Sequence, residues 1–147
     1  MRTEGKELAG RRGRYGFWIW LLTVCAAVRG LFWIVVGPVF NPVDEAQHLG
    51  FVVSLATGHG IPNVHDPLPR EVLELAKRSP TLAFRSEPVV PEQPDDPRWG
   101  VFARQYEAMQ GPAYYALMVP AYWLGRPFGT LGSLYAVRLA SLLLVLA

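Results

Sequence analysis

Two adjacent carboxylates and a nearby imidazole are the side chains of this sequence best suited to chemistry. Asp44 and Glu45 are neighbours, and His48 follows four and three positions later. Residues at these separations share a helix face, so either carboxylate can lie beside the imidazole. A divalent cation held by Asp44 and Glu45, with a phosphate as a further ligand, is one chemistry that this pattern allows.

Two other interpretations compete with such a site. Acidic side chains in the first turn of a helix are ordinary capping groups, because the helix dipole favours negative charge there. Glu45 and His48 also have the spacing of ligands in di-iron helical bundles, which need a second such pair on another helix. His59 and His65 have no glutamate three residues before them, which disfavours a di-iron site.

Three apolar blocks must position these residues: Phe17–Phe40, Pro112–Leu124 and Leu131–Ala147. The first block holds a single charge, Arg29, and it exceeds the roughly 20 apolar residues with which a helix crosses a bilayer. A soluble domain would instead show amphipathic periodicity along most of the chain. The composition therefore predicts an all-α membrane protein with several transmembrane helices.

A cleaved signal peptide is the alternative interpretation of the first block, because basic residues precede it. Cys25 follows Leu22-Thr23-Val24, which resembles a lipoprotein cleavage site except that Val24 is large for its position. The apolar run resumes after Arg29 and becomes long enough to span, which favours an uncleaved helix. As the only cysteine, Cys25 cannot form an internal disulfide, and a small apolar side chain within the helix is its simplest role.

The distribution of charge predicts the orientation of the chain. A basic cluster lies just before the first block and includes Lys6, Arg11, Arg12 and Arg14. Residues 41–110 hold ten acidic and six basic side chains. The positive-inside rule therefore places the N-terminus in the cytoplasm and this loop outside. A basic cluster beside a membrane helix is a topology signal, so no nucleic-acid partner is expected.

The resulting division of the chain has five segments. They are a cytoplasmic tail at 1–16, a first transmembrane helix at 17–40, an external loop with juxtamembrane helices at 41–110, a second transmembrane helix at 111–129 and the start of a third at 131–147. A tight cytoplasmic turn around Arg126 joins the last two helices. The last block ends while it is still apolar, so we expect further helices after Ala147.

Two short helices are expected within the loop. Asn41-Pro42 is typical of a helix start and Gly58–Pro62 of a helix end, which predicts an amphipathic helix along the outer membrane surface. A second helix should run from about Pro69 to Arg78, because apolar residues recur there at helical spacing. Ser79–Arg98 contains five prolines and should be irregular.

Three elements, in order, resemble the GT-C membrane glycosyltransferases, which include the protein O-mannosyltransferases and the lipid A aminoarabinose transferases. The first combines Asp44-Glu45, His48 and Gly58-His59-Gly60-Ile61-Pro62, similar to the start of that family's first external loop. The second is Tyr106-Glu107-Ala108-Met109-Gln110-Gly111-Pro112-Ala113-Tyr114-Tyr115, which looks like the family's opening of the second span. The third is Leu134-Tyr135-Ala136-Val137-Arg138-Leu139, similar to an Arg-Leu pair that often opens the third span.

The resemblance covers about Val28 to Ala147, with two departures. Gly111 stands where the family usually has a proline, and the Pro-rich insert is long. The resemblance implies an inverting enzyme of the bacterial plasma membrane and cell envelope. It would transfer a sugar from a polyprenyl phosphate donor to an acceptor of unknown identity on the outer face. This stretch of the protein is not expected to catalyse without later helices.

The resemblance also implies roles for individual residues. Asp44, or Glu45 in its place, would be the general base that deprotonates the acceptor hydroxyl. His48 would orient the carboxylate or touch the phosphate, and Arg138 or a loop arginine would neutralise the departing phosphate. The remaining candidates, Tyr114 and Tyr115, would line the path of the lipid carrier. No cofactor is implied beyond a divalent cation at the two carboxylates.

Two further points remain open in the sequence. Arg29 and Arg138 are costly inside a bilayer, so each has either a functional role or a structural one through pairing or snorkelling. A non-enzymatic membrane component of surface polysaccharide assembly or export would also fit. So would a transporter whose Asp44 and Glu45 handle a cation.

Overall fold

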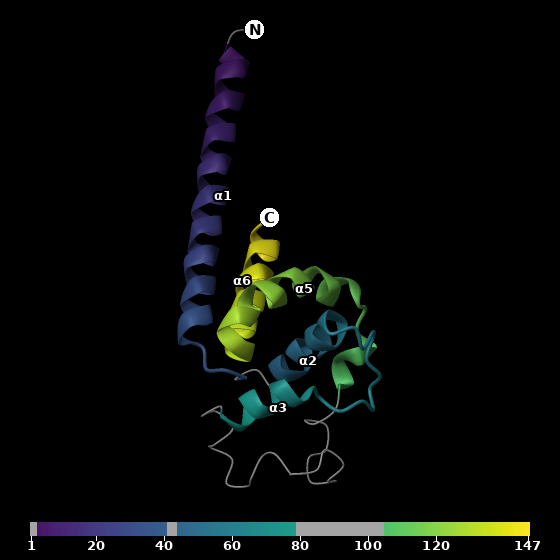
Figure 1. Ribbon diagram of the computed structural model, residues 1–147. Coiled ribbons are helices and arrows are strands. Elements are labelled where there is room, and N and C mark those ends of the chain that lie inside the picture. The colour runs from purple at the N-terminus through teal and green to yellow at the C-terminus, as the bar shows by residue number, and fades with distance from the viewer. Residues whose placement is uncertain (1–2, 41–43, 79–104) are drawn as a thin grey trace.

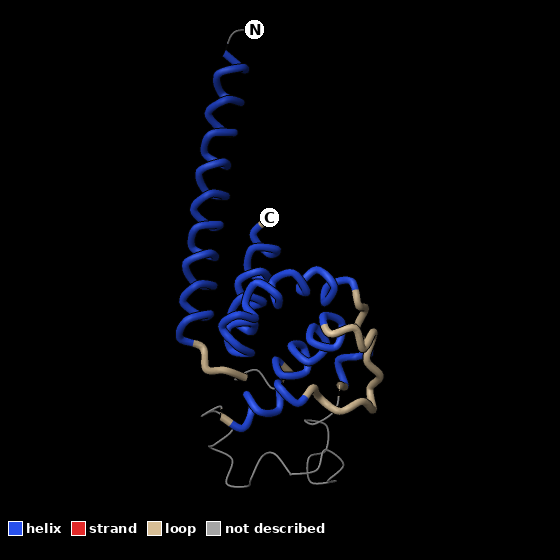
Figure 2. Tube along the Cα trace, in the orientation of Figure 1, coloured by secondary structure: helices blue, strands red, loops and turns tan. Residues whose placement is uncertain are grey.

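The computed structural model describes residues 3–40, 44–78 and 105–147, and these residues form helices and loops without a strand (Figure 2). This confirms the predicted all-α class. The helices are α1 (Thr3–Val36), α2 (Glu45–Ala56), α3 (Arg70–Lys77), α5 (Ala113–Gly125) and α6 (Gly129–Leu146), with short 3₁₀ helices η2 (Tyr106–Met109) and η3 (Arg126–Phe128).

The long helix α1 and the C-terminal helix α6 are in contact and run in opposite directions (Figure 1). Both chain ends therefore point the same way. The other described elements gather toward the opposite end of the molecule, where α1 finishes at Val36. α2 and α3 therefore lie together near the N-terminal end of α6.

Two helical stretches, Tyr15–Val36 and Ala113–Leu146, are long and apolar enough to cross a membrane. In the first, no part of the most apolar window is buried within the protein. Large apolar side chains such as Trp18, Phe32 and Val35 are instead more than half exposed. A continuous apolar surface of this kind on a helix suits contact with lipid or with a protein partner.

The second stretch is divided by a tight turn between α5 and α6. Gly129 has a φ of 77°, a conformation that glycine adopts without strain. Gly125 and Gly132 bring the two backbones together, because a Cβ on Gly125 would lie 2.4 Å from the Gly132 carbonyl oxygen. Ser133 Oγ donates a hydrogen bond of 3.1 Å to the Tyr122 carbonyl and closes the turn.

The sequence predicts a cytoplasmic turn, at the end of a second transmembrane helix, at this place in the chain. Arg126 Nη1 lies 2.6 Å from Glu71 Oε2 of α3, so the turn packs against the segment that was expected on the other side of the membrane. α5 has 13 residues, which give a length of about 20 Å, shorter than a bilayer core of about 30 Å. α5 crosses over α6 at the same end as α2 and α3.

The core of the described part surrounds α2, which packs against α5, α3 and η2. Eight of its twelve residues are buried, and Phe51 stacks on Tyr115 of α5 with ring centroids 4.0 Å apart. The predicted amphipathic surface helix is therefore wrong in its environment: the polar face expected toward water is covered by other elements. Gly58 and Gly60 follow the helix with positive φ, as predicted for its end.

Two predictions about the loop have different outcomes. α3 begins after Pro69 and its buried face carries Val72 and Ala76, which confirms the expected second helix. The expected helix start at Asn41-Pro42 and the expected irregular segment Ser79–Arg98 lie outside the described residues.

Candidate functional site

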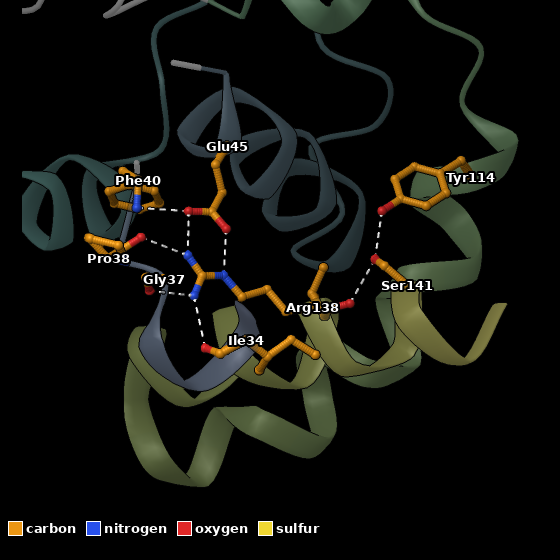
Figure 3. Close-up of polar contacts among 9 residues, drawn as sticks. Ile34, Gly37, Pro38, Phe40, Glu45, Tyr114, Arg138 and Ser141 are labelled. Atoms are coloured by element: carbon orange, nitrogen blue, oxygen red, sulfur yellow. Dashed lines mark hydrogen bonds and ion pairs between the residues drawn. The ribbon is translucent and has the colours of Figure 1, made fainter. Parts of the chain in front are cut away.

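Arg138, on the side of α6 that faces the end of α1, joins three elements (Figure 3). Its Nε and Nη2 donate to the two oxygens of Glu45 at 2.6 and 2.8 Å, a bidentate pair. Its remaining N–H groups donate to the carbonyls of Ile34, Gly37 and Pro38 at 3.0 to 3.2 Å. A guanidinium has five N–H donors, so all of them are used within the protein.

Both carboxylate oxygens of Glu45 accept hydrogen bonds. Besides the two bonds from Arg138, its Oε2 accepts the backbone N–H of Phe40 at 2.7 Å. Phe40 has a φ of 57°, a left-handed conformation that costs a non-glycine residue about 1–2 kcal/mol. The carboxylate thereby holds Phe40, after the end of α1, at the first turn of α2. Glu45 and Arg138 expose only 15 and 14% of their side chains.

Asp44 has a different environment from its neighbour. It is the N-cap residue of α2, yet its side chain makes no capping hydrogen bond. No capping hydrogen bond therefore holds this carboxylate, although its place at the start of α2 still suits the helix dipole. Asp44 Oδ2 lies 3.5 Å from His48 Nε2, and 45% of the Asp44 side chain is exposed. Of the two adjacent carboxylates, Asp44 is the one available for chemistry.

A chain of hydrogen bonds leads from His48 to a residue far away in the sequence. His48 Nδ1 is 2.8 Å from the Tyr115 hydroxyl, which donates to Gln110 Oε1 at 3.1 Å. Gln110 Nε2 donates in turn to Glu107 Oε2. Glu107 is 8% exposed, and one ligand atom from each of Asp44, His48 and Glu107 lies within 4.8 Å of the others.

A pocket of about 510 Å³ opens beside this cluster between α1, α2 and α6. Apolar residues of α1 and α6 form its wall, among them Trp33, Ile34 and Leu142. Asp44 and His48 are among the polar residues at its edge. The pocket thus combines a wall suited to a hydrocarbon chain with a free carboxylate and an imidazole.

The two predicted tyrosines have separate roles. Tyr114 lines the pocket, and its hydroxyl is 2.7 Å from Ser141 Oγ of α6 (Figure 3). Tyr115 is fully buried and belongs to the hydrogen-bond chain of His48 rather than to the pocket wall. Arg29 is exposed on α1 and is not among the described residues that line the pocket.

The structure therefore brings together most, but not all, of the predicted residues. Asp44 and His48 meet as their spacing indicated, and Arg138 is close but turned toward Glu45. The structure does not place Glu45 with Asp44 as a pair of metal ligands. Glu107 was missed as a site residue, although it lies in the second element of the family resemblance and six residues before the apolar helix α5.

Comparison with known proteins adds no family to this description. No family model, curated protein or solved structure matches the chain.

Proposed function

We propose that the protein acts in sugar transfer as part of a membrane glycosyltransferase, with Asp44 as the general base. The observation that carries this proposal is the position of Asp44, a free carboxylate at the edge of an apolar-walled pocket. The pocket lies between the two helical stretches that are apolar enough to cross a membrane. A sugar on a polyprenyl phosphate has the matching parts, a long hydrocarbon chain and a polar head.

In the proposed reaction, Asp44 acts on the acceptor. The acceptor hydroxyl loses its proton to Asp44 while its oxygen bonds to the anomeric carbon of the sugar. The bond from that carbon to the phosphate oxygen breaks, the phosphate leaves with the electron pair, and the configuration inverts. A carboxylate within reach of the acceptor takes up the proton as the new bond forms, which is the role of a general base.

Two of the expected roles change in this proposal. Glu45 is removed as a candidate base, because three hydrogen bonds from Arg138 and the Phe40 backbone already occupy its carboxylate oxygens. Arg138 is removed as the cation that meets the departing phosphate, because its five donors already have acceptors. Both residues instead position Asp44 by fixing the start of α2.

The proposal includes a location. The N-terminus lies in the cytoplasm, and Asp44 faces the outer side of a bacterial plasma membrane. The donor is lipid-linked and the acceptor enters from outside. Surface polysaccharide assembly without catalysis, or cation transport, would use the same carboxylate only for binding.

A sugar-transfer assay in membranes that contain the full-length protein tests the base. Asp44→Asn keeps the size of the side chain but cannot accept the proton, so transfer should fall by about 100-fold or more. Glu45→Gln should lower the amount of folded protein while transfer per folded molecule remains. Asp66→Asn, an exposed loop carboxylate outside the pocket, is the matched control and should retain activity. Full transfer by Asp44→Asn would refute the assignment.

A further inference from the structure

We propose that Asp44, His48 and Glu107 form a binding site for one divalent transition-metal ion of the zinc type. The three residues come from two elements that are far apart along the chain, α2 with its N-cap and η2. One ligand atom from each lies within 4.8 Å of the others, a spacing that a single ion can bridge after small side-chain shifts. The proposal rests on this geometry and does not depend on sugar transfer.

The direction of the hydrogen bonds determines the state of His48. Gln110 donates from its NH₂ group to the Glu107 carboxylate, and its carbonyl oxygen accepts from the Tyr115 hydroxyl. The Tyr115 hydroxyl donates its only proton to that carbonyl, so its oxygen accepts a hydrogen bond from His48. His48 therefore carries a proton on Nδ1.

Because Nδ1 is engaged by Tyr115, the other ring nitrogen, Nε2, is the one left for an ion. Nε2 faces Asp44 Oδ2 at 3.5 Å. The Glu107 carboxylate lies beside them, so three ligand atoms converge where one cation can join them. A histidine whose other ring nitrogen donates to an oxygen is the usual arrangement of a metal ligand, because this bond fixes the tautomer and the ring.

The ligand types select the class of ion. One imidazole and two carboxylates suit Zn²⁺, Co²⁺ or Mn²⁺, whereas Mg²⁺ and Ca²⁺ prefer oxygen ligands alone. Three protein ligands leave a fourth tetrahedral position for an oxygen from the pocket side. Asp44 has two carboxylate oxygens, so one can hold the ion while the other remains available to an acceptor.

Metal titration of the chain tests this site directly. The 147-residue chain, in detergent micelles, without a histidine tag and stripped with EDTA, is titrated with Zn²⁺ in a calorimeter and with Co²⁺ by absorption spectroscopy. The unmodified chain should bind one ion and give Co²⁺ a spectrum of low coordination number. His48→Ala and Glu107→Gln should abolish this binding, whereas His59→Ala, an exposed histidine near the end of α2, should bind normally.

A second variant guards against loss of binding through misfolding. Tyr115→Phe keeps the ring that stacks on Phe51 but removes the acceptor of the His48 proton, so Zn²⁺ affinity should fall about 10- to 100-fold. The proposal fails if His48→Ala binds Zn²⁺ as tightly as His59→Ala does.

Discussion

The pairing of Arg138 with Glu45 decides which of two adjacent carboxylates remains free. Both acids precede the same helix, and nothing in their order along the chain separates them. Their surroundings do: Glu45 receives three hydrogen bonds and is mostly buried, whereas Asp44 lies beside His48 at a pocket. The difference in role therefore arises from contacts with α6, which is more than 80 residues away in the sequence.

We predict that Arg138→Met destabilises the fold far more than Arg126→Met. Loss of Arg138 leaves Glu45 charged and buried without its partner, which costs about 3–5 kcal/mol. Arg126 forms a more exposed pair with Glu71, with 43% of its side chain open to solvent, so its loss should cost at most about 1 kcal/mol. Urea unfolding in micelles measures both changes.

The double variant Arg138→Met with Glu45→Gln is the control for this comparison. Removing the unpaired charge should restore part of the lost stability, because the penalty lies in the buried carboxylate. Equal destabilisation by the two arginine variants would show that the Glu45 pair contributes no more than a surface contact.

The candidate site could be predicted only in part from the sequence. Asp44 and His48 are four residues apart, so helical geometry alone brings them together. Glu107 reaches them through the packing of η2 on α2, and no local pattern encodes that contact. The sequence also cannot show which backbone carbonyls accept hydrogen bonds from Arg138, because every residue has a carbonyl.

At the scale of elements, close backbone contacts at glycines set the position of α6. Gly30 of α1 faces the end of the Leu142 side chain, whereas Gly125 of α5 faces the backbone of Gly132 and Ser133. A side chain can rotate away from an added methyl group, but a helix backbone cannot move without its neighbours. The two contacts should therefore tolerate substitution differently.

We predict that Gly125→Ala is destabilising and Gly30→Ala is nearly neutral. The Cβ added at position 125 would approach the Gly132 carbonyl oxygen to 2.4 Å, an overlap that costs about 1–3 kcal/mol. At position 30 the better helix propensity of alanine, up to about 1 kcal/mol, offsets the rotation of Leu142. Thermal unfolding in micelles compares them, with Gly16→Ala as the control because nothing lies within 4 Å there.

A larger loss at position 30 than at position 125 would contradict this interpretation. It would mean that the Leu142 side chain cannot rotate away between α1 and α6, and that the backbone of the α5–α6 turn can shift.

The helices themselves were largely predictable, because apolar runs and Pro or Gly boundaries mark them. α3, α5 and α6 begin and end within a few residues of the expected positions. The apolar runs could not show how each helix is oriented relative to the others. The 13 residues of α5 are as apolar as a membrane span, but packing with α2 and the contact of Arg126 with Glu71 hold this helix at one end of the molecule.

On the scale of the whole molecule, this arrangement changes the number of expected crossings. α1 and α6 are antiparallel, and both the N-terminus and the C-terminal end lie away from α2, α3 and the α5–α6 turn. A membrane around α1 and α6 would leave the Arg126 turn on the same side as Asp44. Two crossings then replace the three that hydropathy alone predicts for residues 17–147.

Cysteine labelling distinguishes the two topologies. In a Cys25→Ala background, single cysteines replace Met109, Phe128 or Thr3, and intact cells are treated with a membrane-impermeant maleimide. Met109 and Phe128 are 85 and 81% exposed, so a thiol at either position is accessible. With two crossings, positions 109 and 128 label together from outside and position 3 labels only after permeabilisation. With three crossings, position 128 would instead follow position 3, because the turn after α5 would lie in the cytoplasm with the N-terminus.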